Sequence, residues 1–171
     1  MANVNTRVVL RTNALLNEQY GRQFYYGEGS LTGAGDAGRK RAKRIALGTK
    51  LFGAVLMFAP LRWLALKFFL PKPGEGPSAD EQRAGFFDLR FCGQTDSGKE
   101  VRVKVTGDRD PGYGSTSKMI AQAAISLRRD VDKTQLEGGF WTPGSAFGES
   151  LFQRLETSAG LTFEVENISA D

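Results

Sequence analysis

The sequence predicts an α+β fold in which helices pack on a mixed sheet that contains an antiparallel hairpin. Segments from Gly85 onward alternate apolar and polar residues, which is typical of strands with one buried face. Other segments in the same half repeat apolar residues every three or four positions, as helices do. The predicted order strand, strand, helix, helix, strand excludes an all-parallel sheet, because a short hairpin joins antiparallel strands.

The hairpin is the clearest of these elements. The stretches GFFDLRFCG (85–93) and KEVRVKVTG (99–107) flank the turn residues TDSG. In the first strand Phe87, Leu89 and Phe91 share one face, while Asp88 and Arg90 take the other. In the second strand three valines alternate with two outward-facing basic residues, so one face of the hairpin is predicted to be buried.

Two helices and a strand are predicted after the hairpin. The first helix covers 115–129, with Ser115 or Thr116 as its N-cap and arginines in its last turn. Its predicted core-facing stripe consists of Ile120, Ala123, Ala124 and Leu127. The second helix runs from the N-cap Thr142 to Gly160, with Pro143 at its first position. The stretch LTFEVE (161–166) is predicted to be the last strand, with Leu161, Phe163 and Val165 facing inward.

The first half of the chain is less regular. Residues 6–16 fit either a helix or a strand, and the aromatic stretch QFYYGEG (23–29) reads as a short strand or an extended turn. A basic block, RKRAKR (39–44), and an apolar run (51–70) together predict a helical insertion over 39–70. The Pro- and Gly-rich stretch 71–80 is predicted to be a linker.

Composition limits the chemistry of the chain. It has no histidine and a single cysteine, Cys92, so it lacks the commonest general base, an internal disulfide and a multi-cysteine zinc site. The net charge of +4 is uneven, because nine basic residues and no acid lie between Asp36 and Glu75. The rest of the chain sums to −5, so the local basic block predicts a local anionic partner.

The stretch GAGDAG (33–38) has the G-x-G-x-x-G spacing of a dinucleotide-binding turn. That motif also needs a βαβ unit and an acidic residue about 20 positions further on. No acid lies between Asp36 and Glu75, and no second strand completes such a unit. The sequence therefore favours a glycine-rich loop before a basic helix, and we expect no cofactor-binding residue and no metal ligand in this chain.

The apolar run 51–70 is long enough to span a bilayer, but Arg62, Lys67 and Pro60 interrupt it. Because each central charge costs roughly 2.5–3.5 kcal/mol, an amphipathic helix or helical pair is favoured over a single span. Such a pair fits a membrane surface or a buried protein interface, and both remain open. Nucleic acid is not expected as a partner, since the apolar run would have no role in phosphate contact. The predicted membrane-facing residues are Arg39, Lys40, Arg41, Lys43, Arg44, Trp63, Phe68 and Phe69.

Two turns lead into the predicted helices of the second half. GDRDPGYGSTS (107–117) joins a strand to a helix start, where backbone N–H groups favour an anion, and GGFWTPGS (138–145) is similar. The alternative is an ordinary tight turn with a helix cap in each place. The candidate residues for binding substrate or an anion are Asp110, Gly112, Tyr113, Thr116 and Thr142. No catalytic constellation emerges, so the catalytic residues are unknown.

These two turns carry a resemblance to a known family. VTGDRDPGYGSTSKMIAQAAISL and GGFWTPGSAFGESLFQRLETSAGLTFEV resemble the C-terminal half of the saccharopine dehydrogenase-like oxidoreductases, which include mycobacterial trans-acting enoyl reductases and a lipid-droplet-associated animal member. RVVLRTNALL, the apolar run and FFDLRFCGQ match in the same order, so the resemblance covers residues 6–166. The paired motifs consist of Asp110, Pro111, Gly112, Tyr113 and Thr116, then Gly138, Gly139, Thr142 and Pro143.

The resemblance implies a two-part enzyme. Its N-terminal Rossmann domain, expected to be absent here, would bind NAD(P), and residues 1–171 would shape the substrate site and support oligomerisation. The expected function is the C-terminal part of an oxidoreductase of lipid metabolism, inactive alone; the alternative is a standalone membrane-surface or lipid-binding module. Expected partners are a membrane or lipid surface, a lipid-like substrate, and either a second copy or the missing Rossmann domain. The expected location is intracellular, at a membrane or lipid droplet.

Overall fold

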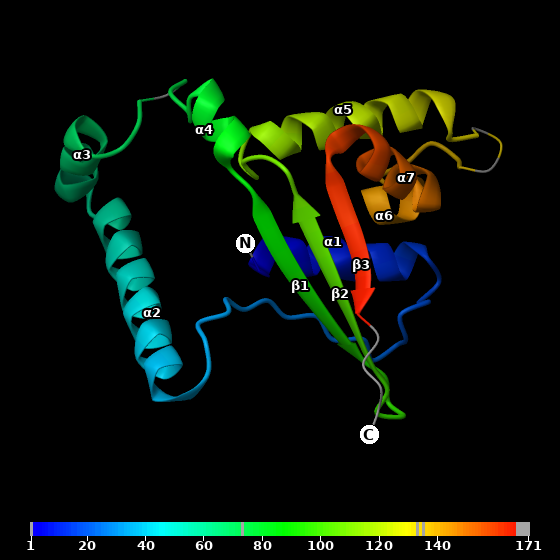
Figure 1. Cartoon of the computed structure of the whole chain (residues 1–171), viewed down its shortest axis with the longest axis horizontal. Helices are drawn as coiled ribbons and strands as arrows, with labels where there is room; N and C mark the ends of the chain where they lie inside the picture. The colour runs from blue at the N-terminus through cyan, green and yellow to red at the C-terminus, as the bar shows by residue number, and fades with distance from the viewer. Residues whose placement is uncertain (1, 73, 133, 135, 167–171) are drawn as a thin grey trace. The chain divides into compact units, whose positions relative to one another are not determined.

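A computed structural model describes residues 2–72, 74–132, 134 and 136–166 of the chain. They divide into two compact units, which we call the sheet unit and the helix-pair unit. The sheet unit comprises Asn3–Phe24 and the residues from Pro77, and the helix-pair unit comprises Tyr25–Gly76. Figure 1 shows the helices and strands of both units with their labels. Each unit is described by itself.

The sheet unit is built on three strands in the order β1-β2-β3: β1 (Phe87–Gln94), β2 (Glu100–Gly107) and β3 (Leu161–Glu166). Both neighbouring pairs are antiparallel. The predicted hairpin and closing strand are therefore confirmed, as is the α+β class. The described sheet is antiparallel throughout rather than mixed, because the helices between β2 and β3 return the chain against β2 in the opposite direction.

Register gives the sheet one apolar and one polar face. Leu89 pairs with Val105, which pairs with Phe163, and the next apolar row is Phe91, Val103 and Val165. Only part of the apolar face is covered, since Leu161 is 5% exposed while Val165 is 64% exposed. The described core of this unit is accordingly small.

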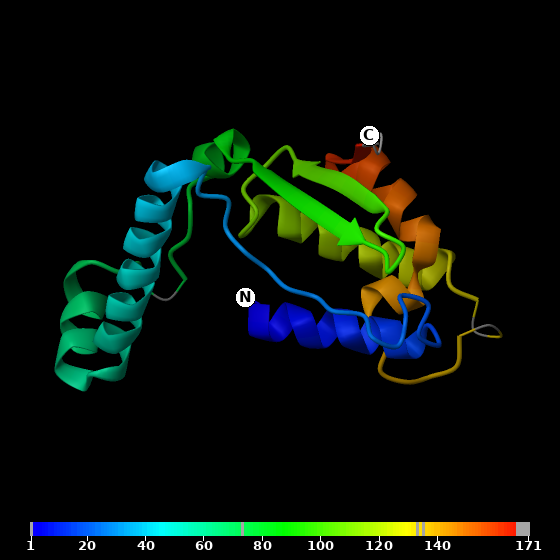
Figure 2. The same ribbon diagram turned by 90° about the horizontal axis from the view of Figure 1, so that it is seen from below.

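Three helices follow β2: α5 (Gly114–Arg129), α6 (Pro143–Ala146) and α7 (Gly148–Ala159). Helix α7 contacts both α5 and β3, and Figures 1 and 2 show α5 and α7 side by side. The ring of Phe152 on α7 meets that of Phe163 edge-on at 5.0 Å between centroids, so α7 covers the apolar face at β3. The single predicted helix from Thr142 is two, because Gly148 adopts a φ of +53° after the short α6.

The predicted core-facing stripe of α5 is wrong for most of its residues. Ile120, Ala124 and Leu127 are exposed, and Ala123 alone is half-buried. The buried face instead carries Ser115 and Ser126, which are both fully buried. The hydroxyl of Ser126 lies 3.4 Å from that of Ser150 on α7, so small polar side chains let the two helices approach closely.

Two more helices complete the sheet unit. Residues 6–16, which fitted a helix or a strand, belong largely to helix α1 (Ala2–Leu15). Helix α4 (Ala79–Ala84) was not predicted, and it includes the last two residues of the predicted linker 71–80. Ser78 starts α4 with a capping box, accepting from the N–H of Glu81 while the Glu81 carboxylate accepts from the N–H of Ser78. This S-x-x-E pattern was the available sequence signal.

The helix-pair unit contains α2 (Gly35–Met57) and α3 (Ala59–Phe68). The aromatic stretch 23–29 forms no strand in the structure and is irregular from Phe24. The sequence left an amphipathic helix or a helical pair open for the apolar run 51–70, and the structure shows the pair. The axes of α2 and α3 are bent by 103° at Phe58. Pro60 lies within the first turn of α3, where its missing N–H and fixed φ suit a helix start.

Candidate functional site

The turn between β2 and α5 is organised by one carboxylate. An oxygen of Asp110 accepts from the N–H of Tyr113 at 2.7 Å and from the N–H of Gly114 at 3.2 Å. Its backbone carbonyl accepts from the N–H of Ser115 at 2.8 Å. The N-terminus of α5 is thus capped from Asp110, and the prediction that Ser115 or Thr116 caps it is wrong. Both hydroxyls instead donate to upstream carbonyls, at Arg109 and Pro111.

This capping determines the charge of the turn. Hydrogen bonds from the backbone N–H groups of Tyr113 and then Gly114 hold the pKa of Asp110 below its usual value, so the carboxylate is ionised. Two of the N–H groups at the start of α5 are therefore already bonded to an anion of the chain itself. The exposed Tyr113 side chain and Gly112 lie on the same turn. An external anion or substrate there stays a prediction.

Thr142 lies in a different polar cluster, which joins α1 to α6. Its hydroxyl is 2.7 Å from that of Thr12 and 2.9 Å from that of Ser145, and both threonines are buried. The Ser145 hydroxyl accepts from the N–H of Thr142, which completes a capping box and confirms Thr142 as a helix N-cap. Every buried side-chain polar atom in the described residues has a partner. This geometry gives Thr142 a structural role, and its binding role stays a prediction.

A third cluster was absent from the sequence predictions. It joins α5, the end of α7 and the residue that follows β2. The Lys118 ammonium lies 3.3 Å from both carboxylate oxygens of Asp108 and 3.5 Å from the carbonyl of Ala159. Gly160 follows with a φ of +74°, and a Cβ there would lie 2.4 Å from the Asp108 carboxylate. Glycine is therefore required by both backbone conformation and close approach. The glycine after a helical pattern was foreseen, whereas its acidic neighbour comes from a distant segment.

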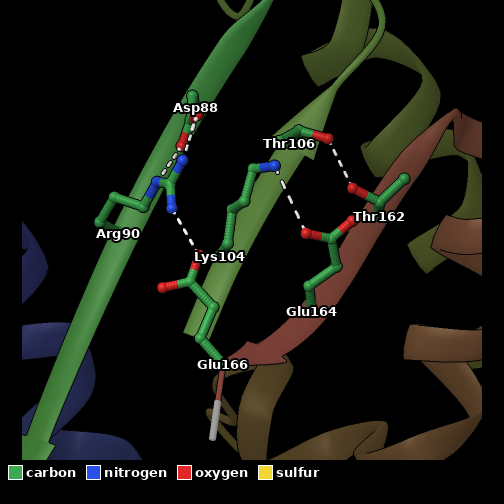
Figure 3. Close-up of polar contacts among 7 residues, drawn as sticks. All are labelled: Asp88, Arg90, Lys104, Thr106, Thr162, Glu164 and Glu166. Carbon is green, nitrogen blue, oxygen red and sulfur yellow. Dashed lines mark hydrogen bonds and ion pairs between the residues drawn. The ribbon is translucent and has the colours of Figure 1, made fainter. Parts of the chain in front are cut away.

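The polar face of the sheet carries a row of paired charges, shown in Figure 3. Arg90 bonds both carboxylate oxygens of Asp88, at 2.8 and 3.1 Å, and reaches Glu166 on β3 at 2.6 Å. Lys104 lies 3.4 Å from Glu164. The sequence predicted that Asp88, Arg90 and Lys104 face outward, and the structure confirms it. Their partners depend on register across three strands, which the sequence pattern did not specify.

A surface hollow of about 250 Å³ lies where α5 ends beside α7, and none of the predicted substrate residues lines it. It is lined by Asp130, Ser150, Gln153, Arg154 and Thr157. The Arg154 guanidinium bonds both carboxylate oxygens of Asp130, at 2.5 and 2.8 Å. These bonds lower the pKa of Asp130 to about 2, so the hollow carries a matched ion pair rather than an unpaired acid.

The glycine-rich stretch 33–38 is the first turn of a helix rather than a turn after a strand. Helix α2 begins at Gly35, inside the stretch, and the residues from Tyr25 up to it are irregular. Gly38 is buried, and a Cβ there would lie 1.9 Å from the carbonyl oxygen of Gly33. Gly38 thus serves close backbone packing. The described residues also include no cluster of His, Cys, Asp or Glu arranged to hold a metal.

The predicted membrane-facing residues all fall on the helix pair or its end. The five basic ones, Arg39, Lys40, Arg41, Lys43 and Arg44, lie within the first half of α2 and are exposed. Trp63 and Phe68 lie on α3, and Phe69, which is 80% exposed, follows it. Within the described residues no single helix is long and apolar enough to cross a membrane, although the bent pair meets the length and composition required. Contact with a membrane stays a prediction.

These observations define an α+β protein with a partly covered sheet and an exposed helical pair, and its described residues form no catalytic set. The chain is homologous to the trans-acting enoyl reductases, which confirms the resemblance carried by its two turn motifs. It is 33% identical, over 172 residues, to a Mycobacterium tuberculosis protein whose name places it in that group; the match covers 99% of this chain and 41% of that protein.

Two further relatives give the same result. The trans-acting enoyl reductase of Mycobacterium leprae is 32% identical over 176 residues, covering 98% of this chain and 40% of the relative. That of Mycobacterium bovis is 32% identical over 173 residues, covering 96% and 40%. The chain thus spans about two fifths of the length of the curated relatives that it matches. No protein-family profile matches the chain. No solved structure matches it significantly.

Proposed function

We propose that this chain is the C-terminal, substrate-shaping part of an NAD(P)-dependent enoyl reductase of lipid metabolism. The observation that carries the proposal is the identity of 33% along 99% of the chain with a protein named for that activity. In enoyl reduction a nicotinamide hydride adds to one carbon of a C=C bond and a proton adds to the other, so that the double bond becomes saturated and NAD(P)H becomes NAD(P)⁺.

In this proposal NAD(P) binds to a part of the protein outside this chain. The antiparallel sheet of the described residues offers no βαβ crevice, and the glycine-rich stretch 33–38 opens a helix without a strand before it. The chain by itself is then inactive, because the proposal places the hydride donor on another part of the protein. Its own contribution is a rigid scaffold. The capped turn at Asp110 and the buried Thr12–Thr142 contact hold the loops that begin α5 and α6.

The proposal extends to a lipid-like substrate and contact with a membrane or lipid surface. The support is the helix-pair unit, where aromatic and aliphatic side chains such as Trp63, Leu66 and Phe69 are exposed. A surface of this kind on a soluble domain marks an interaction site. An intracellular membrane or lipid droplet is the proposed location, and a second copy or the nucleotide-binding part is the proposed protein partner.

A chimaera tests the reductase proposal. The segment of the M. tuberculosis relative that this chain matches would be replaced by the chain, and NADPH binding and NADPH-dependent reduction of a trans-2-enoyl thioester would be measured. We expect the chimaera to bind NADPH and reduce the thioester, and the chain alone to do neither. A chimaera that binds NADPH, retains its helix content and fails to reduce the thioester contradicts the proposal.

The second candidate function is a standalone membrane-surface or lipid-binding module without enzymatic activity. Its support is again the exposed helix pair, which needs no other domain to meet a lipid surface. Titration of the chain alone with NADPH tests both candidates together, with Trp63 and Trp141 fluorescence as the readout. Saturable binding at micromolar NADPH would contradict both, because each assigns no cofactor site to this chain.

A further inference from the structure

Helix α2 carries a basic stripe and an apolar stripe on different faces. Its basic stripe consists of Arg39, Lys43 and Lys50, at successive spacings of four and seven residues. Its apolar stripe consists of Ile45, Phe52 and Leu56, at spacings of seven and four residues. Because a helix turns once every 3.6 residues, each set shares one face, and the two faces lie about 140° apart around the helix. The other basic residues, Lys40, Arg41 and Arg44, lie on other faces, so the first half of α2 is basic on most sides and the apolar side chains gather in its second half.

The two charged residues of the apolar run, Arg62 and Lys67, lie on α3, after the break between α2 and α3. At Phe58 the backbone is extended, with a φ of −90° and a ψ of 110°. An Nη of Arg62 donates to the carbonyl of Leu56 at 3.3 Å, so this charge lies against the carbonyl end of α2. The Lys67 ammonium lies 4.7 Å from the centre of the Trp63 ring and 5.3 Å from that of Phe68. Both cations thus lie beside groups that tolerate them at an apolar boundary.

The basic residues of this unit are not neutralised within the described structure. The ion pairs of the described residues involve none of the nine lysines and arginines between Asp36 and Glu75. In the sheet unit, by contrast, basic residues such as Arg90, Lys104 and Arg154 all face carboxylates. The uncompensated charge and the exposed aromatic side chains of α3 therefore belong to the same unit.

We propose that α2 and α3 lie flat on a bilayer that contains anionic phospholipid. The basic stripe of α2 contacts the headgroups, and Trp63, Phe68 and Phe69 enter the boundary between headgroups and acyl chains. This inference rests on the proposed membrane contact and adds its lipid chemistry and orientation. Charge complementarity favours an anionic surface, and the aromatic side chains would have no partner on a nucleic acid duplex. The centres of protein interfaces are poor in lysine, which disfavours a protein occupant.

Vesicle binding of the whole chain tests the proposal. Co-sedimentation would compare vesicles of phosphatidylcholine alone with vesicles that also contain roughly 30% phosphatidylglycerol. The anionic lipid gives the second kind of vesicle a negative surface potential. We expect the anionic vesicles to bind more tightly, with affinity falling as salt rises. The variant Arg39→Gln/Lys43→Gln/Lys50→Gln should bind about 100-fold more weakly, at roughly fivefold per charge. Glutamine keeps helix propensity, and circular dichroism would check the fold.

A matched variant controls for net charge. Arg7→Gln/Lys99→Gln/Arg128→Gln removes the same charge from the sheet unit, and it should bind the anionic vesicles as the unmodified chain does. An equal loss in both triple variants overturns the proposed site. Insertion is read from a blue shift of Trp63 emission in a Trp141→Phe background, and an unshifted emission with vesicles bound overturns the proposed orientation.

The remaining outcomes separate this inference from the broader proposal. Equal binding to neutral and anionic vesicles leaves the membrane contact standing and overturns the anionic preference. Failure to bind either vesicle overturns both. Tighter binding to single-stranded RNA than to anionic vesicles, or a dimer in light scattering that excludes vesicles, overturns the lipid surface as the occupant. None of these outcomes bears on the enoyl reductase chimaera, so the two proposals fail separately.

Discussion

The two units of this chain differ in where their side chains find contacts. In the sheet unit, residues from distant segments meet: Thr12 bonds Thr142, Arg90 bonds Glu166, and Leu161 is buried beside the end of α7. In the helix-pair unit the side-chain contacts are local, as in Lys67 over Trp63, and the large apolar side chains of α3 are exposed. The sheet unit is thus stabilised largely from within, whereas the helix pair presents the surface that an outside partner would cover.

Replacing one buried and one exposed leucine by alanine should give the largest difference between the units in the free energy of unfolding. Leu161→Ala in β3 is expected to lower the free energy of unfolding by about 2–5 kcal/mol, because the residue is 5% exposed and its removal leaves a cavity. Leu66→Ala in α3, where the side chain is 51% exposed, should change it by about 0.5 kcal/mol or less. Urea unfolding would be followed by Trp141 fluorescence in a Trp63→Phe background. Equal effects would contradict the contrast in burial.

Adding a methyl group should have opposite effects in the two units. Gly160→Ala places a Cβ 2.4 Å from the Asp108 carboxylate at a φ of +74°, so we expect a loss of about 1–3 kcal/mol. Gly53→Ala, inside α2 with no atom within 4 Å of the new Cβ, should raise helix stability by up to about 1 kcal/mol. Thermal unfolding by circular dichroism measures both. A stabilising Gly160→Ala would mean that the end of α7 can rearrange.

Substitutions at the two buried threonines, Thr12 and Thr142, should have non-additive effects on the free energy of unfolding. Thr12→Val and Thr142→Val each remove the buried hydrogen bond between the two hydroxyls and leave the remaining one its second partner, the Ser145 hydroxyl or the Val8 carbonyl, so each is expected to lose about 0.5–1.5 kcal/mol. The double variant should lose less than the sum, because both partners are then apolar. Thr157→Val, whose exposed hydroxyl donates to the carbonyl of Gln153, is the control. Strict additivity in urea unfolding would contradict a direct contact.

The smallest expected effect concerns acid stability. The hydrogen bonds from Arg154 hold the pKa of Asp130 at about 2, below an unfolded value of about 3.9. The ionised form is the one stabilised, so this contribution is complete above about pH 4 and is lost as the pH falls towards 2. In the Arg154→Met variant the free energy of unfolding should fall less between about pH 4 and pH 2 than it does in the unmodified chain. Urea midpoints measured from pH 5 to pH 2 test this, and parallel curves would contradict it.

Several local features could be predicted because their signals lie within a few residues. Alternation in 87–94 and 100–107 predicted the hairpin, and Thr142 was foreseen as a cap. The N-cap of α5 was misassigned because Asp110 bonds the helix from outside the expected serine and threonine positions. The predicted stripe on α5 failed for a different reason. Its period was helical, but small side chains at Ser115 and Ser126 allow closer packing than Ile120 and Leu127 would.

By itself, the sequence determined the α+β class, the hairpin, the helical character of the apolar run and the resemblance to trans-acting enoyl reductases, because periodicity, caps and motif residues are local. The tertiary structure decided which side chains meet. Gly160 beside Asp108 and Arg90 with Glu166 depend on strand register and on helices that return the chain across the sheet. Such contacts join positions far apart in the sequence, and no local pattern encodes the distance between them.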